Sequence, residues 1–309
     1  MRKFLALVLV LLPLGTFAQE KVVFMPHWTP QAQFVGYYLA LEKGFYSEQG
    51  LNVEIQHPSQ SKSTFDYLNE GECQFTTTFL IAAMLRYSNG AEVTNVMQTS
   101  QGSTQLVVAH KPISSASDLK GLKIARWSVG FNTLGEILDK ELGLDIQWIP
   151  TIWNVGIYKS WAVDAIMCQS YNELFQLIAS GEEIPSSNML YMSDAGFNVP
   201  EDGVYALRSY CEQNPEIVSK FVAASKKGWQ YAYENRDEAL EITMKYVDAA
   251  GVVTNAVAQR WMLDHVLDVV YDGDFDMNLT SSVLDRVNMV LKNNGFTSAL
   301  VPFDKFVWK

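Results

Sequence analysis

The feature that most constrains the fold is a strand-like run followed by a polar, aromatic loop and a helix-like run. Val22–Met25 is apolar and predicts a buried strand, and Gly44 ends the helix that follows. A second strand-like run covers Asn52–Gln56. The apolar face expected for the helix consists of Phe34, Tyr37, Tyr38 and Leu41. A strand, a helix and a strand in this order predict a βαβ unit.

Strand-like and helix-like segments alternate along the rest of the chain. Apolar runs that predict strands cover residues 73–77, 93–98, 104–110, 123–126, 145–149, 165–169, 189–192 and 204–209. Helical periodicity covers residues 62–68, 79–87, 131–142, 172–179, 215–234, 236–248, 254–269 and 281–293. This pattern indicates an α/β protein of one or two domains.

The N-terminus has the pattern of a secretory signal. Arg2 and Lys3 precede an apolar run over 4–14 and a small-residue exit at Ala18, after which we expect cleavage. The run is shorter than the roughly 20 residues of a spanning helix, and no later stretch is apolar enough to span a membrane. The first cysteine is Cys73, which argues against a lipid anchor just after the run.

Charge and metal-binding residues narrow the function further. The net charge of -11, without a cluster of Lys and Arg, disfavours nucleic acids and anionic membranes as partners. Three buried thiols are favoured over one disulfide plus a free thiol, and the scattered histidines predict no metal site. The cysteines are Cys73, Cys168 and Cys211, and the histidines are His27, His57, His110 and His265.

Three motifs near the N-terminus carry a resemblance to a known family. They are W-x-P from Trp28, F-x-G-x-Y-x-A from Phe34 and E-K-G-F-Y-x-E-x-G-L from Glu42. The segment resembles periplasmic substrate-binding proteins of ABC importers, in the SsuA/Thi-like branch that includes binders of thiamine-pyrimidine precursors.

The resemblance implies a two-lobe, type II periplasmic-binding-protein fold with a ligand cleft between lobes joined by two hinge strands. It implies a signal peptide over 1–18, a first lobe from 19–111 and 208–309, and a second lobe from 112–207. The partners it implies are a membrane permease and its ATPase, with the binding protein periplasmic and monomeric.

Loops after the predicted strands should supply the site, because open α/β sheets bind ligands at the carboxyl ends of their strands. Aromatic rings and amides dominate these loops, which suits a neutral or weakly basic heterocycle. The candidate ligand-binding residues are His27, Trp28, Gln31, Tyr37, Trp127, Asn132, Trp153, Tyr171, Phe197 and Glu201. Packing roles remain open for Trp28, Trp127 and Tyr37.

The resemblance implies roles for two of these residues. In the pyrimidine-precursor binders a stretch near Phe197 and Glu201 supplies an aromatic stacker and a carboxylate, although Asn198 replaces an expected glycine. Trp28 and Glu201 are expected on opposite sides of the cleft. Alkylsulfonates, taurine and riboflavin remain alternative ligands.

An enzyme of similar sequence is the competing interpretation. Thiamine-pyrimidine synthases use a Lys and a His four residues later, and alignment on residues 71–82 places Thr78 and Ala82 there. Without the amine and the imidazole we expect no catalysis and no cofactor.

Overall fold

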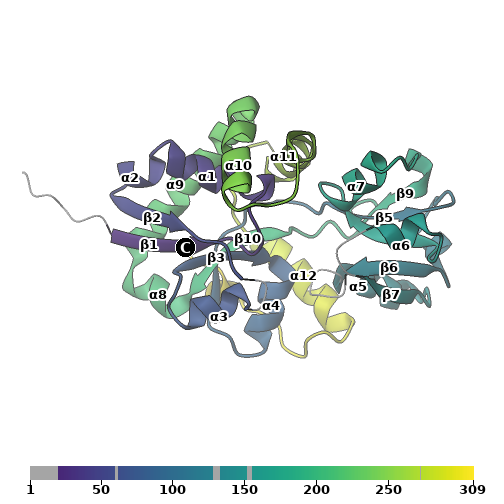
Figure 1. Ribbon diagram of the computed structural model, residues 1–309. Coiled ribbons are helices and arrows are strands. Elements are labelled where there is room, and N and C mark those ends of the chain that lie inside the picture. The colour runs from purple at the N-terminus through teal and green to yellow at the C-terminus, as the bar shows by residue number, and fades with distance from the viewer. Residues whose placement is uncertain (1–19, 60–61, 128–132, 152–154, 272) are drawn as a thin grey trace, which may run out of the picture.

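The computed structural model describes residues 20–59, 62–127, 133–151, 155–271 and 273–309, which form two lobes, each built on its own five-stranded sheet (Figure 1). The first sheet has the order β2-β1-β3-β10-β4 and the second β7-β6-β8-β5-β9. The first sheet contains β1 (Glu20–Met25), β2 (Leu51–Ile55), β3 (Phe75–Phe79), β4 (Val93–Met97) and β10 (Asp202–Leu207). The second contains β5 (Gln105–Ala109), β6 (Lys123–Trp127), β7 (Gln147–Thr151), β8 (Ala165–Gln169) and β9 (Met189–Tyr191).

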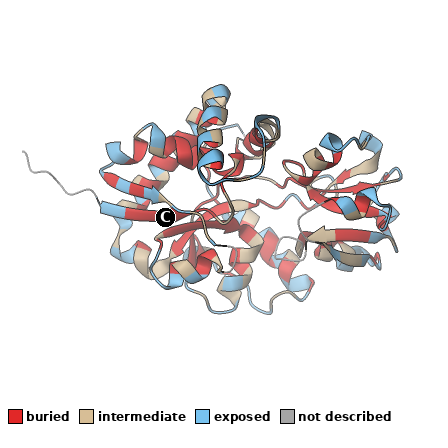
Figure 2. Ribbon diagram, in the orientation of Figure 1, coloured by how far each residue is buried: buried red, intermediate tan, exposed pale blue. Residues whose placement is uncertain are grey.

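Each sheet combines parallel strands with a strand of opposite direction. β1 runs parallel to β2 and β3, whereas β10 is antiparallel to β3 and β4. β6 runs parallel to β7 and β8, and β5 is antiparallel to β8 and β9. Figure 2 shows that most residues of β1, β3, β5, β8 and β10 are buried. This burial explains the nearly continuous apolar sequences of β5 and β8, whereas the edge strands β2 and β7 are partly exposed and carry polar residues.

Most helices belong to the first lobe. They are η1 (Ala32–Phe34), α1 (Val35–Glu42), α2 (Phe45–Glu48), α3 (Thr64–Asn69), α4 (Leu80–Ser88), α8 (Arg208–Gln213), α9 (Pro215–Glu234), α10 (Arg236–Ala249), α11 (Ala256–Val270), α12 (Ser281–Asn293) and α13 (Phe303–Phe306). The second lobe carries η2 (Ala116–Leu119), α5 (Thr133–Leu142), α6 (Gly156–Lys159), α7 (Glu173–Ala179) and η3 (Ser186–Asn188).

α1 packs closely against α9 through two glycines. A Cβ added at Gly228 would overlap the carbonyl oxygen of Gly36, and one added at Gly36 would overlap the ring of Trp229. α1 is therefore buried nearly all round, including Val35 and Leu39, rather than along the single face that its sequence predicts.

α12 connects the lobes by a second route. Leu284 and Leu291 belong to one apolar cluster that also contains Val23 of the first sheet and Ile124 of the second. Lys140 of α5 donates to the carbonyl oxygen of Asn294, just after α12. α12 thus holds the lobes together in addition to the chain crossings.

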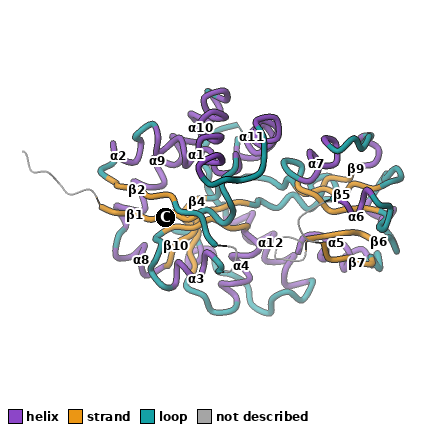
Figure 3. The backbone as a smooth tube through the Cα atoms, in the orientation of Figure 1, coloured by secondary structure: helices purple, strands orange, loops and turns teal. Residues whose placement is uncertain are grey.

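The lobe boundaries differ from those predicted. β5, which the sequence placed in the first lobe, lies in the second sheet, and β10, placed in the second lobe, lies in the first sheet. The crossings therefore fall between β4 and β5 and between β9 and β10, where Figure 3 shows loop segments running between the lobes. The strand predicted over 204–209 is also too long, since α8 begins at Arg208.

Three further features bear on function. Cys73, Cys168 and Cys211 are free and buried, which confirms the thiol prediction. In the described part of the chain no helix combines the length and apolar character required to cross a membrane. Across the same residues, no group of three or more His, Cys, Asp or Glu side chains is arranged to hold a metal ion.

Candidate functional site

A pocket of about 470 Å³ lies between the two lobes. The first lobe contributes the loop after β1, η1 and the end of β3, and the second contributes the ends of β6 and β8 and the start of α7. The residues that line it are His27, Trp28, Gln31, Gln33, Phe79, Trp127, Gln169, Tyr171, Asn172 and Glu173. The pocket thus lies at the carboxyl ends of β1, β3, β6 and β8, as expected for open α/β sheets.

A wider groove of about 1340 Å³ continues from this pocket. The groove then runs along α7 to Asn255 and Gln259 of the first lobe. The residues that line both the pocket and the groove are Trp28, Gln31, Trp127, Tyr171 and Asn172. Trp261 of α11 reaches across and donates from Nε1 to the carbonyl oxygen of Ser170 at 2.8 Å. Contact between the lobes therefore borders the groove.

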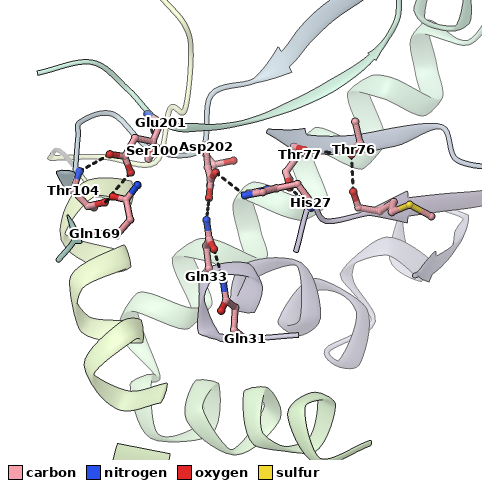
Figure 4. Close-up of polar contacts among 12 residues, drawn as sticks. His27, Gln31, Gln33, Thr76, Thr77, Ser100, Thr104, Gln169, Glu201 and Asp202 are labelled. Carbon is pink, nitrogen blue, oxygen red and sulfur yellow. Dashed lines mark hydrogen bonds and ion pairs between the residues drawn. The ribbon is translucent and has the colours of Figure 1, made fainter. Parts of the chain in front are cut away.

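His27, which lines the pocket, and Asp202, which lies beside it, belong to a buried polar network (Figure 4). His27 Nδ1 is 2.7 Å from the Thr77 hydroxyl, and its Nε2 is 3.8 Å from Asp202 Oδ1. Burial lowers the pKa of His27 to about 3, so the ring is neutral at pH 7. Gln33 donates to Asp202 Oδ2 at 2.6 Å, and Gln31 donates to Gln33.

Glu173 fixes Trp127, the aromatic wall of the pocket in the second lobe. Its carboxylate accepts from Trp127 Nε1 at 2.9 Å, from Asn172 Nδ2 at 2.9 Å and from the backbone N–H of Gln169 at 2.8 Å. Burial raises the pKa of this carboxyl, and these hydrogen bonds oppose the shift. The indole of Trp127 is thereby held in one orientation at the pocket.

His57 supports the loop of Trp28, which forms the aromatic wall of the pocket in the first lobe. Its Nδ1 lies against the carbonyl oxygen of Trp28, and its Nε2 is 3.0 Å from the hydroxyl of Tyr38. Burial lowers the pKa of His57 to about 4, so a neutral ring can donate to Trp28 and accept from Tyr38. The loop that carries Trp28 is thus anchored to α1.

Glu201 joins the two crossing segments. Its carboxylate accepts from the Ser103 hydroxyl at 2.9 Å and from the Thr104 N–H and hydroxyl, each at 2.8 Å (Figure 4). Asn198 accepts from the Ser103 N–H at 3.0 Å, which gives the unexpected asparagine a role between the segments. Glu201 lines two smaller pockets beside the main one, of about 320 and 260 Å³, rather than the main pocket itself.

The remaining sequence candidates lie in different places. Tyr37 is buried, and its hydroxyl is 2.7 Å from Thr99 Oγ1, behind the pocket lining. Phe197 belongs to the apolar cluster shared with α12 and is absent from the described lining of the main pocket. Asn132 and Trp153, like the predicted signal peptide over 1–18, lie outside the described residues.

Five of the ten candidates are therefore brought together: His27, Trp28, Gln31, Trp127 and Tyr171. Sequence reasoning did not select Gln33, Phe79, Gln169, Asn172 or Glu173 as ligand contacts. The loops predicted to supply the cleft do contain four of these residues, namely Gln33, Gln169, Asn172 and Glu173, because these loops follow strands.

Comparison with known proteins identifies relatives of similar sequence and structure. A riboflavin-binding protein, RibY of Chloroflexus aurantiacus, is 27% identical over 75% of this chain and 68% of its own. A formylaminopyrimidine-binding protein of Halalkalibacterium halodurans is 25% identical over 75% of this chain and 72% of its own. The periplasmic aliphatic sulphonate binding protein SsuA of Escherichia coli superposes with a TM-score of 0.71 at 16% identity, covering 94% of this chain and 97% of that one.

The fold is therefore the two-lobe, type II fold of periplasmic binding proteins, as the sequence resemblance implied. The family described as NMT1/THI5 like matches residues 31–239. This range includes most of the first sheet, the whole second sheet and the residues that line the main pocket, apart from His27 and Trp28. The chain belongs to the NMT1/THI5-like family.

Proposed function

We propose that this chain is the extracytoplasmic solute-binding component of an ABC importer and that its ligand is a thiamine-pyrimidine precursor, of the formylaminopyrimidine or hydroxymethylpyrimidine type. The supporting observation is the convergence of Trp28, Trp127 and Tyr171 with amide side chains in one pocket between two lobes. Aromatic faces stack on planar rings, while amides donate to and accept from ring nitrogens and exocyclic groups.

The relatives support two ligands of this kind. The formylaminopyrimidine-binding relative favours a pyrimidine, and RibY supports riboflavin as the alternative. Alkylsulfonates and taurine rank lower, because the described residues that line the pocket include neither Lys nor Arg. Arg126, at the end of β6, is paired with Glu136 instead.

Catalysis of the thiamine-pyrimidine synthase type is not part of the proposal. Thr78 lies in β3 and Ala82 in α4, at the positions where those enzymes carry Lys and His. A threonine cannot form an imine with pyridoxal phosphate, and an alanine supplies no nitrogen. A binding role needs no cofactor.

The proposal includes export with cleavage after Ala18, action as a monomer in the periplasm, and delivery to a membrane permease driven by a cytoplasmic ATPase. Two lobes around a cleft suit this task, because a permease can distinguish closed from open forms by their surfaces.

A ligand screen tests the class of solute. We expect formylaminopyrimidine or hydroxymethylpyrimidine to raise the Tm in a thermal-shift assay, since a ligand at 100 times its Kd stabilises a protein by roughly 2.7 kcal/mol. Thiamine, riboflavin, taurine and alkylsulfonates complete the panel. The strongest shift from a sulfonate, or no shift from any compound, would contradict the proposed ligand.

Removing one aromatic wall tests the pocket. Trp28→Ala is expected to weaken binding of the best ligand in the screen about tenfold or more, because stacking adds roughly 0.5–1.5 kcal/mol to the effect of area burial. Isothermal titration calorimetry gives the Kd. Trp161→Ala is the matched control, since that indole is 69% exposed and stacks on His110 rather than in the pocket. Equal affinities for Trp28→Ala and the parent protein would place the site elsewhere.

A further inference from the structure

The electrostatics of the pocket carry information about the charge of its ligand. Glu173 lines the pocket, and Asp202 lies behind Gln33, which lines both the main pocket and the adjoining one of about 260 Å³. Glu201 lines the same adjoining pocket. Burial raises the pKa of the Tyr171 hydroxyl well above its usual value, and the negative charges of Asp202, Glu201 and Glu173 raise it further.

The described lining supplies no positive charge to balance these groups. It contains neither Lys nor Arg, and its single histidine, His27, is neutral because burial lowers its pKa. Asp202 shows the imbalance most clearly. Its side chain is 14% exposed, Gln33 bonds one oxygen, and the other, Oδ1, is buried without a hydrogen-bond partner.

The aromatic ring of Trp127 also favours a positively charged ligand. The face of an indole attracts cations, and a carboxylate that accepts from the indole N–H increases the electron density of the ring. Trp127 is held by Glu173 in this way. Because three hydrogen bonds occupy the Glu173 carboxylate, we treat it as a positioning residue that acts through Trp127 and through its charge.

We propose that the pocket selects ligands whose ring carries a positive charge when bound, so that a neutral aminopyrimidine takes up a proton as it binds. The inference rests on the proposed function and adds the charge state of the ligand. The proton comes from solvent and is held on a ring nitrogen, and no covalent bond between ligand and protein forms or breaks. The titratable groups around it are Glu173 of α7, His27 after β1, Tyr171 after β8, and Glu201 and Asp202 at the start of β10.

Two compounds of the same size test this inference. We expect 4-amino-5-hydroxymethyl-2-methylpyrimidine to bind at least about tenfold more tightly than its 4-oxo counterpart, which lacks a basic ring. The factor follows because a nearby opposite charge shifts a pKa by roughly 1–3 units. Calorimetry at pH 8 in two buffers of different ionisation enthalpy should show net proton uptake when the amino compound binds and none when the oxo compound binds.

Variants separate the charge from the shape of the pocket. Glu173→Gln and Asp202→Asn should each reduce the proton uptake and the preference for the amino compound. Glu183→Gln, an exposed change beyond the end of α7, should leave both unchanged. Equal binding of the two compounds, binding without proton uptake, or a preference for neutral riboflavin would overturn the inference and leave the binding function intact. If no compound in either set binds, the proposed function fails and the inference fails with it.

Discussion

Gly228→Ala is expected to lower the free energy of unfolding by about 3 kcal/mol or more, at the upper end of the effects of overpacking. The added Cβ would overlap the carbonyl oxygen of Gly36 and lie 2.8 Å from the Cβ of Ala40. Both neighbours belong to α1, so the helices can accommodate the methyl group only by moving apart. The roughly 1 kcal/mol that alanine gains over glycine in helix propensity is too small to compensate.

Urea denaturation followed by circular dichroism would measure this loss. Gln230→Ala is the control, because it changes an exposed side chain on the same helix and should alter stability by less than about 0.5 kcal/mol. Ligand affinity should also fall in Gly228→Ala, since α1 continues directly from η1, which carries Gln33. A variant as stable as the parent protein would mean that α1 and α9 are not packed backbone to backbone.

The second large effect concerns pH. Burial raises the pKa of Glu201 and that of Asp202 to about 7 each, above their unfolded values of 4.5 and 3.8. A raised pKa means that the folded state holds these protons more tightly than the unfolded state does. The resulting stabilisation is complete below about pH 4 and is lost as the pH rises through 7. Each unit by which the folded pKa exceeds the unfolded pKa corresponds to roughly 1.4 kcal/mol, so the loss of stability amounts to several kcal/mol.

The Tm should therefore decrease from pH 5 to about pH 7 and level off towards pH 8. In Asp202→Asn the decrease should be clearly smaller, because an amide does not titrate. Asp194→Asn removes the same charge from an exposed position and controls for general repulsion in a chain of net charge -11. Identical pH profiles for the two variants would show that burial of Asp202 does not control stability.

The sequence predicts most elements because their periodicity is local. The helix over 215–234 has the predicted bounds, with Pro215 in its first turn, and β8 matches the strand predicted over 165–169. Which sheet a strand joins is not a local property. Residues 105–109 are mostly apolar on both faces and fit either lobe equally well. The predicted lobe boundaries are therefore each wrong by one strand, β5 at the first crossing and β10 at the second.

In the site too, features that depend on local sequence are predicted and those that depend on long-range contacts are not. Trp127 and Tyr171 were predicted because they follow strands, and the strands do end at the pocket. The bonds of Glu201 were not predicted, because its partners Ser103 and Thr104 lie 98 and 97 residues away in the chain. These hydrogen bonds form only because the two chain segments that cross between the lobes lie side by side. The role of Glu201 as a ligand contact, expected from the resemblance, remains a prediction.

The position of β10 also determines the order in which the chain can fold. β10 lies between β3 and β4, although the whole second sheet separates it from them in sequence. A nascent chain that ends before Leu207 therefore cannot complete its first sheet, and β3 keeps an unpaired edge until then. The second sheet has all its strands by Tyr191 and can form earlier. Assembly should thus begin in the middle of the chain, and the N-terminal lobe should acquire native structure only after β10 is inserted between β3 and β4.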